Sequence, residues 1–259
     1  MIKDNLHEIN SKLPSDVTLV AVSKFHPVER LMEAYNAGQR VFAESRPQEL
    51  AAKVPQMPAD VQWHFIGHLQ TNKLKLVLPY VSLVQSVDSL HLLQAISTWA
   101  VAHNKVIDVL LELHLGEEET KQGFSEDEIM AIISGAGISS QTHGHPRPCK
   151  REGPTAASSD ALRVGRGRSE AEAVCEDIPA PMKGVRIRGL MGMASNTEDR
   201  AQVEGEFARI EALYKRIKAS GMEGFDTLSI GMSGDWPLAV QHGATMVRIG
   251  TDIFGPREY

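Results

Sequence analysis

The sequence predicts an α/β protein of one domain, a single (β/α)8 or TIM barrel that spans residues 1–259. Short apolar, β-branched segments alternate with longer segments of helical period, and eight such segments follow one another along the chain. The length and a hydrophobic content of 42% suffice for one large core. An open doubly wound sheet is the alternative that this alternation leaves open.

The predicted strands are the segments richest in apolar and β-branched residues. They lie at residues 17–23, 40–44, 63–66, 83–86, 107–113, 185–193, 227–230 and 246–249. Helices are predicted at residues 28–37, 89–103 and 200–220, with a shorter one before Pro55. Gly38 and Gly221 end two of these helices, and Ser89 is a suitable N-cap for the helix that it opens.

Residues 134–183 interrupt the alternation. The segment is rich in Gly, Ser, Pro, Arg and His, which predicts a low-order insertion between the fifth helix and the sixth strand, opposite the usual active-site end. His143, His145 and Cys149 lie close together in it, but a reliable fourth metal ligand is absent, so a flexible loop is favoured over a metal site. Its acidic residues oppose its basic ones, which argues against nucleic-acid binding.

Charge and composition exclude several classes of function. A net charge of −6 and a pI near 5.9 give no general attraction to nucleic acid or to anionic membranes. Residues 1–13 lack the apolar stretch of a signal peptide, and no later segment is apolar enough to span a bilayer. Cys149 and Cys175, the two cysteines, lie in no CxxC or zinc-ligand pattern. We therefore expect a cytoplasmic protein that binds a small molecule.

Lys24 is the first candidate for chemistry. It comes directly after the first predicted strand, in the sequence VAVSKFHP. In a parallel barrel the carboxyl ends of the strands surround the mouth, where burial lowers the pKa of a lysine and favours Schiff-base chemistry. Position alone does not distinguish this role from that of a surface lysine at the start of a loop.

Two glycine-containing loops follow the last two predicted strands. Their candidate ligand-binding residues are Gly231, Met232, Ser233, Arg248, Gly250 and Thr251. Barrels commonly bind phosphate at this position, through backbone N–H groups, hydroxyls and a helix N-terminus, so a phosphate-bearing ligand is favoured. For Arg248, a ligand contact and a structural ion pair remain equally open.

Further polar side chains follow the second and third predicted strands. The segments FAESR at residues 42–46 and WHFIGHLQTNK at residues 63–73 place Glu44, His64 and several polar neighbours at one predicted rim. Such a concentration predicts a hydrogen-bonding pocket, although an individual histidine here is more often structural than catalytic.

Several motifs are specific in combination. They are VAVSK at residues 20–24, HFIGHLQTNK at 64–73, QSVDS at 85–89, RGLMGM at 188–193, LSIGMSGDW at 228–236 and VRIGTDIFGPREY at 247–259. By these motifs the chain resembles the pyridoxal phosphate homeostasis proteins, a family with an alanine-racemase-like N-terminal domain, also called proline synthetase co-transcribed proteins. The resemblance runs over residues 6–127 and 185–259 and implies a barrel similar to fold-type III pyridoxal phosphate enzymes.

The resemblance also implies roles for individual residues. Lys24 would hold pyridoxal 5′-phosphate as an internal aldimine, and Arg248 would face the pyridine nitrogen. The residues that would surround the phosphate are Gly231, Met232, Ser233, Gly250 and Thr251. Because arginine does not readily give up a proton, the ring would stay unprotonated and would be a weak electron sink.

Two features depart from the family pattern. Ala43 and Ser45 stand where family members usually carry glycine and asparagine, which removes an asparagine that normally contacts the cofactor. The segment at residues 134–183 is longer than the one that usually connects these elements in relatives.

The expected function is to bind pyridoxal phosphate and take part in its homeostasis without catalytic turnover. The alternative is an amino-acid racemase, which needs a second base from an additional β domain and a partner subunit. Ten residues follow the eighth predicted strand, too few for such a domain, and of the tyrosines Tyr259 alone could reach the mouth. We expect a monomer whose protein partners are pyridoxal phosphate-dependent apoenzymes, with no nucleic-acid or membrane partner.

Overall fold

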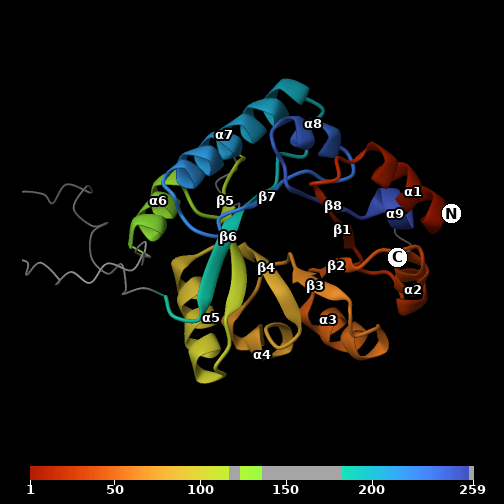
Figure 1. Ribbon diagram of the computed structural model, residues 1–259, viewed down its shortest axis with the longest axis horizontal. Coiled ribbons are helices and arrows are strands. Elements are labelled where there is room, and N and C mark those ends of the chain that lie inside the picture. The colour runs from red at the N-terminus through yellow and green to blue at the C-terminus, as the bar shows by residue number, and fades with distance from the viewer. Residues whose placement is uncertain (117–122, 136–181, 257–259) are drawn as a thin grey trace, which may run out of the picture.

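The computed structural model describes residues 1–116, 123–135 and 182–256, and these form a closed barrel (Figure 1). Eight parallel strands pair in sequence order, and the last strand pairs with the first. The predicted (β/α)8 barrel is confirmed, and the open sheet is excluded. The strands are β1 (Thr18–Val22), β2 (Val41–Glu44), β3 (Gln62–Phe65), β4 (Val81–Val87), β5 (Ile107–Leu113), β6 (Val185–Gly192), β7 (Thr227–Ser229) and β8 (Met246–Ile249).

The barrel has two separate apolar regions, because successive residues of a strand face opposite sides. The inner region is a small cluster with one residue from each of six strands: Val20, Ala43, Leu83, Leu110, Met191 and Met246. Strand neighbours of these residues, such as Leu19 and Phe42, belong to a much larger cluster between the strands and the helices. The outer cluster therefore holds the helices on the barrel, and the inner one fills its centre.

Helices surround the strands, and α1 lies beside α9, where the two ends of the described chain meet (Figure 1). The Asn5 side-chain amide donates a hydrogen bond of 3.0 Å to the Ile253 carbonyl across this contact. The helices are α1 (Ile2–Lys12), α2 (Val28–Asn36), α3 (Pro47–Lys53), α4 (Leu74–Val77), α5 (Leu90–Ala102), α6 (Glu126–Gly135), α7 (Arg200–Ala219), α8 (Trp236–Gln241) and α9 (Thr251–Phe254). Two 3₁₀ turns occupy Val54–Gln56 and Thr71–Lys73.

Most of the predicted elements occur within a residue or two of their predicted ends. Ser89 caps α5 as predicted, since its hydroxyl accepts a hydrogen bond from the Leu92 N–H. Helix α1 was missed, although the three residues that it buries, Ile2, Leu6 and Ile9, have the i, i+4, i+7 spacing of an amphipathic helix. Helix α6 continues to Gly135, inside the segment predicted as an insertion, and residues 136–181 of that segment lie outside the described part of the chain.

Two further properties concern only the described residues. None of their helices is both long and apolar enough to cross a membrane. No group of three or more histidine, cysteine or acidic side chains among them is arranged to hold a metal ion. His143, His145 and Cys149 fall outside the described ranges.

The turn after β7 requires glycine at position 231. Gly231 has a φ of +94°, which side-chain-bearing residues rarely adopt. A Cβ atom there would lie 2.7 Å from the Ala239 Cβ and 3.0 Å from the Trp236 Cα, both on the α8 side of the turn. Gly231 thus allows α8 to pack closely beneath the loop that follows β7.

We expect the substitution Gly231→Ala to lower the free energy of unfolding by about 3 kcal/mol or more, because it adds a steric clash to backbone strain. Gly221→Ala is the matched control: its φ is +80°, and its Cβ would meet nothing within 4 Å. Strain alone should cost that variant about 1–2 kcal/mol. Urea denaturation measures both values, and equal losses would contradict the clash.

Candidate functional site

A cavity of about 230 Å³ opens at the carboxyl ends of the strands. It is lined by Val22, Lys24, His26, Ile66, Met191, Met193, Met232, Ser233, Gly234, Arg248, Gly250 and Thr251. Six of the seven residues predicted to bind a cofactor are therefore brought together. The seventh, Gly231, does not line the cavity; its carbonyl accepts a hydrogen bond of 3.0 Å from the Arg248 backbone N–H.

Lys24 follows the inward-facing positions of β1. Val20 belongs to the inner apolar cluster, and Val22 and Lys24, at steps of two residues, line the cavity. The next residue, Phe25, has a φ of +68°, a left-handed conformation that costs a bulky side chain about 1–2 kcal/mol. The chain thus turns sharply and with strain directly after the lysine.

Three hydrogen bonds fix the side chain of Arg248. Its Nη1 donates to the Ser229 carbonyl at 2.8 Å and to the Ser229 hydroxyl at 2.7 Å, and its Nη2 donates to the Gly192 carbonyl at 2.9 Å. A guanidinium carries five N–H groups, so two remain for a ligand in the cavity that Arg248 lines. Burial lowers the pKa of Arg248 to about 10, although Glu112 and Asp235 oppose the shift, so the side chain is a cation at neutral pH.

A chain of hydrogen bonds continues from Arg248 across the inside of the barrel. The Ser229 hydroxyl lies 2.7 Å from Gln85 Oε1, and Gln85 Nε2 lies 2.9 Å from His64 Nδ1. Because arginine only donates, the direction of each bond follows: Ser229 donates to Gln85, and Gln85 donates to His64. His64 therefore carries its proton on Nε2. Burial lowers its pKa to about 4, so it is neutral at pH 7.

The two loops after β7 and β8 form one side of the cavity. Ser233 and Thr251 contribute hydroxyl groups, and Gly250 lies where a Cβ would come within 3.2 Å of the Val22 carbonyl. The Met232 N–H is already bound by the Asp235 carboxylate. Met193 and Met232 also line the cavity and are 44% and 38% exposed.

Glu44 does not lie at the wet rim where the sequence placed it. It is fully buried, with Oε1 accepting hydrogen bonds of 2.7 Å from the Ser23 hydroxyl and from Lys53 on α3. Its strand neighbour Ala43 faces the barrel centre, so Glu44 faces the helices instead.

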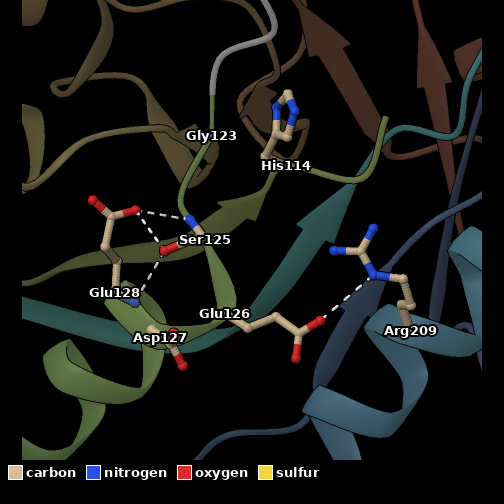
Figure 2. Close-up of a pocket in the computed structure, with 7 residues that line it drawn as sticks. All are labelled: His114, Gly123, Ser125, Glu126, Asp127, Glu128 and Arg209. Carbon is tan, nitrogen blue, oxygen red and sulfur yellow. Dashed lines mark hydrogen bonds and ion pairs between the residues drawn. The ribbon is translucent and has the colours of Figure 1, made fainter. Parts of the chain in front are cut away.

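A second pocket, of about 580 Å³, lies between the end of β5 and helices α6 and α7 (Figure 2). Its residues are His114, Gly123, Ser125, Glu126, Asp127, Glu128 and Arg209. Figure 2 shows Ser125 and Glu128 bonded to each other, with the Ser125 N–H at 2.8 Å from Glu128 Oε2 and the Glu128 N–H at 3.2 Å from the Ser125 hydroxyl. This is a capping box at the start of α6, and the Glu126–Arg209 ion pair at 3.6 Å links α6 to α7. Four of the side chains around this pocket, those of Ser125, Glu126, Glu128 and Arg209, therefore have structural roles.

Three residues of the barrel interior had no predicted role: Gln85, Ser229 and Glu112. The first two hold Arg248 and His64 in place. Glu112 is 6% exposed, and burial raises its pKa to about 7, with the charge of Asp88 adding to the shift. The sequence held a signal for two of them. Gln85 lies two residues after Leu83, and Glu112 lies two residues after Leu110, and both leucines face inward.

We expect His64 to make the fold sensitive to acid. The folded protein binds a proton on His64 only near pH 4, whereas the unfolded chain does so near 6.5, so stability falls as the pH falls through this window. By pH 5 the loss due to His64 should be about 2 kcal/mol.

The substitution His64→Asn tests this expectation, because asparagine can accept the hydrogen bond from Gln85 without titrating. Unfolding free energies at pH 7 and pH 5 should show the larger decrease in the unsubstituted protein. The same decrease in both proteins would contradict the assignment.

The sequence matches known families over most of its length. The family described as alanine racemase, N-terminal domain, matches residues 1–140 and 156–258. The pyridoxal phosphate homeostasis protein of Vibrio alginolyticus is 30% identical over 273 aligned residues, which cover 100% of this chain and 98% of that protein. The protein of the same description from Pasteurella multocida is 31% identical, with 95% and 88% covered.

Solved structures agree with this assignment. PipY of Synechococcus elongatus, a COG0325 family member whose structure has PLP bound, is 29% identical with a TM-score of 0.75, and 98% of this chain and 100% of that chain are covered. Alanine racemase of Clostridium difficile, at 12% identity and a TM-score of 0.67, shares the fold, and 57% of that chain is covered. The chain therefore belongs to the pyridoxal phosphate homeostasis protein family, within the alanine racemase N-terminal domain proteins.

Proposed function

We propose that this protein binds pyridoxal 5′-phosphate in the cavity at the barrel mouth, and that it serves cofactor homeostasis by holding the cofactor on Lys24. The observation that carries the proposal is the convergence of Lys24, Arg248 and the two hydroxyl-bearing loops on one cavity. Membership of the family supports it, as does the PLP-bound structure of PipY.

The residues present fit this cofactor. Bound pyridoxal phosphate supplies an aldehyde that reacts with amines. Lys24 would hold the cofactor through its amine nitrogen, by a C=N bond made with loss of one water molecule. Ser233 and Thr251, which line the cavity, would hold the phosphate through their hydroxyls, and Gly250 would allow the backbone to approach it.

Arg248 limits the chemistry that this site supports. Its two remaining N–H groups would serve a ring nitrogen as hydrogen-bond donors, while a pKa of about 10 keeps its proton on the guanidinium. Among the described residues that line the cavity no carboxylate is available to pair with the ring nitrogen, so stabilisation of a carbanion would be weak. This property favours a holding role over turnover.

One observation favours the second candidate function, an amino-acid racemase. Glu112 lies on an inward-facing position of β5 and has a pKa of about 7, which suits a general base. It is not among the residues that line the cavity, so the holding function is the better supported. We also propose that the protein is a monomer and that it passes the cofactor to apoenzymes that use it.

We expect the purified protein with pyridoxal phosphate to show the absorbance band of a lysine-bound cofactor. Borohydride reduction should then fix one cofactor on Lys24, identified by mass spectrometry of peptides. Lys24→Ala should lose both the band and the modified peptide, because no amine remains at that position. Lys73→Ala, at another lysine of the shared motifs that does not line the cavity, is the control and should keep both. A modified peptide elsewhere in the unsubstituted protein would contradict the assignment.

We expect no racemase activity. Single L-amino acids incubated with the loaded protein in deuterated water should exchange their Cα hydrogen no faster than with free cofactor. Exchange above that rate, lost in Glu112→Gln, would instead establish the racemase.

A further inference from the structure

The turn that carries Lys24 is attached to a largely buried group of charges between β2 and α3. Glu44 on β2 and Glu49 and Lys53 on α3 form this group, which we call the α3 charge cluster. Lys53 Nζ lies 2.7 Å from Glu44 Oε1 and 3.1 Å from Glu49 Oε2. The side chains of Lys53 and Glu44 are 9% and 0% exposed, so water screens their interaction little.

The cluster binds the backbone on both sides of Lys24. Lys53 Nζ donates a hydrogen bond of 2.9 Å to the Ser23 carbonyl, before the lysine. Glu49 Oε2 accepts a hydrogen bond of 2.9 Å from the Phe25 N–H, after it. Two charge-assisted hydrogen bonds therefore fix the peptide groups that flank Lys24.

The bond to Phe25 falls on the strained residue of this turn. Phe25 has a φ of +68°, and a conformation of this kind persists where surrounding contacts over-determine it. Glu49 also pairs with Arg46, whose guanidinium lies 4.3 Å from the centre of the Phe25 ring. The carboxylate thus joins the backbone of Phe25 to a cation that stacks on its side chain.

We propose that Lys53 and Glu49 are positioning residues for Lys24, which hold the left-handed turn at Phe25 so that the lysine amine lies in the cavity. This inference rests on the proposed function. It adds that the affinity for pyridoxal phosphate is set in part by charges that do not touch the cavity.

The expected effect follows from the population of the left-handed turn. If the turn is no longer held, most molecules relax Phe25, and the apparent dissociation constant rises as the binding-competent fraction falls. We expect Lys53→Met to raise the dissociation constant for pyridoxal phosphate about tenfold, which corresponds to about 1.4 kcal/mol. Absorbance titration of the apoprotein measures it.

Two further variants keep the test decisive if Lys53→Met does not fold. Glu49→Ala removes the acceptor for Phe25 at a side chain that is 23% exposed, and it should weaken binding in the same way. Lys215→Met is the matched control, because it breaks an exposed lysine–glutamate pair on α7 and should leave the dissociation constant unchanged.

A change at Phe25 separates the positioning role from a general loss of stability. Asparagine adopts the left-handed conformation at low cost, so Phe25→Asn added to Glu49→Ala, and to Lys53→Met where that folds, should restore most of the affinity without restoring the melting temperature.

The inference is overturned if the folded Glu49→Ala protein binds as tightly as the unsubstituted one, or if Phe25→Asn restores nothing. Failure of the proposed function looks different, because the unsubstituted protein itself would then form no borohydride-stable bond at Lys24.

Discussion

The pairing of β1 with β8 is the interaction on which the site depends. It closes the barrel, with Val20 opposite Arg248 and Ala21 opposite Ile249. Lys24 follows β1 and Arg248 lies on β8, so two residues more than two hundred positions apart in sequence meet at one cavity only when this seam forms. A ligand that contacts both strands stabilises the closed barrel, because it binds the folded chain and not the unfolded one.

The polar interior is stable because its hydrogen bonds are consistent in direction. A buried arginine, a hydroxyl, an amide and an imidazole each find a partner, and each donor faces an acceptor. The neutral state of His64 completes this order, since a protonated ring would place two donors face to face at Gln85. Arg248 is thus held rigidly before any ligand binds, and little rotamer entropy is lost on binding.

The sequence contained enough information to predict the barrel and the cavity residues, since Lys24, Ser233 and Arg248 sit at strand ends within specific motifs. It did not predict which way Glu44 faces. In a parallel barrel both faces of a strand are largely apolar, so Phe42 and Ala43 do not reveal the phase of the alternation. The hydrogen bonds from Arg248 to His64 join β8, β7, β4 and β3, and such long-range contacts have no local pattern. Whether Lys24 holds the cofactor stays a prediction of sequence and geometry together.

Two methionines are the adaptable part of the cavity lining. Met193 and Met232 are unbranched and partly exposed, so they change rotamer at little energetic cost, whereas Arg248, in the same lining, is fixed by three hydrogen bonds. The opening can widen by rotation of these methionines while the seam between the first and last strands keeps its shape. Entry and exit of a ligand then require side-chain rotations and no separation of strands.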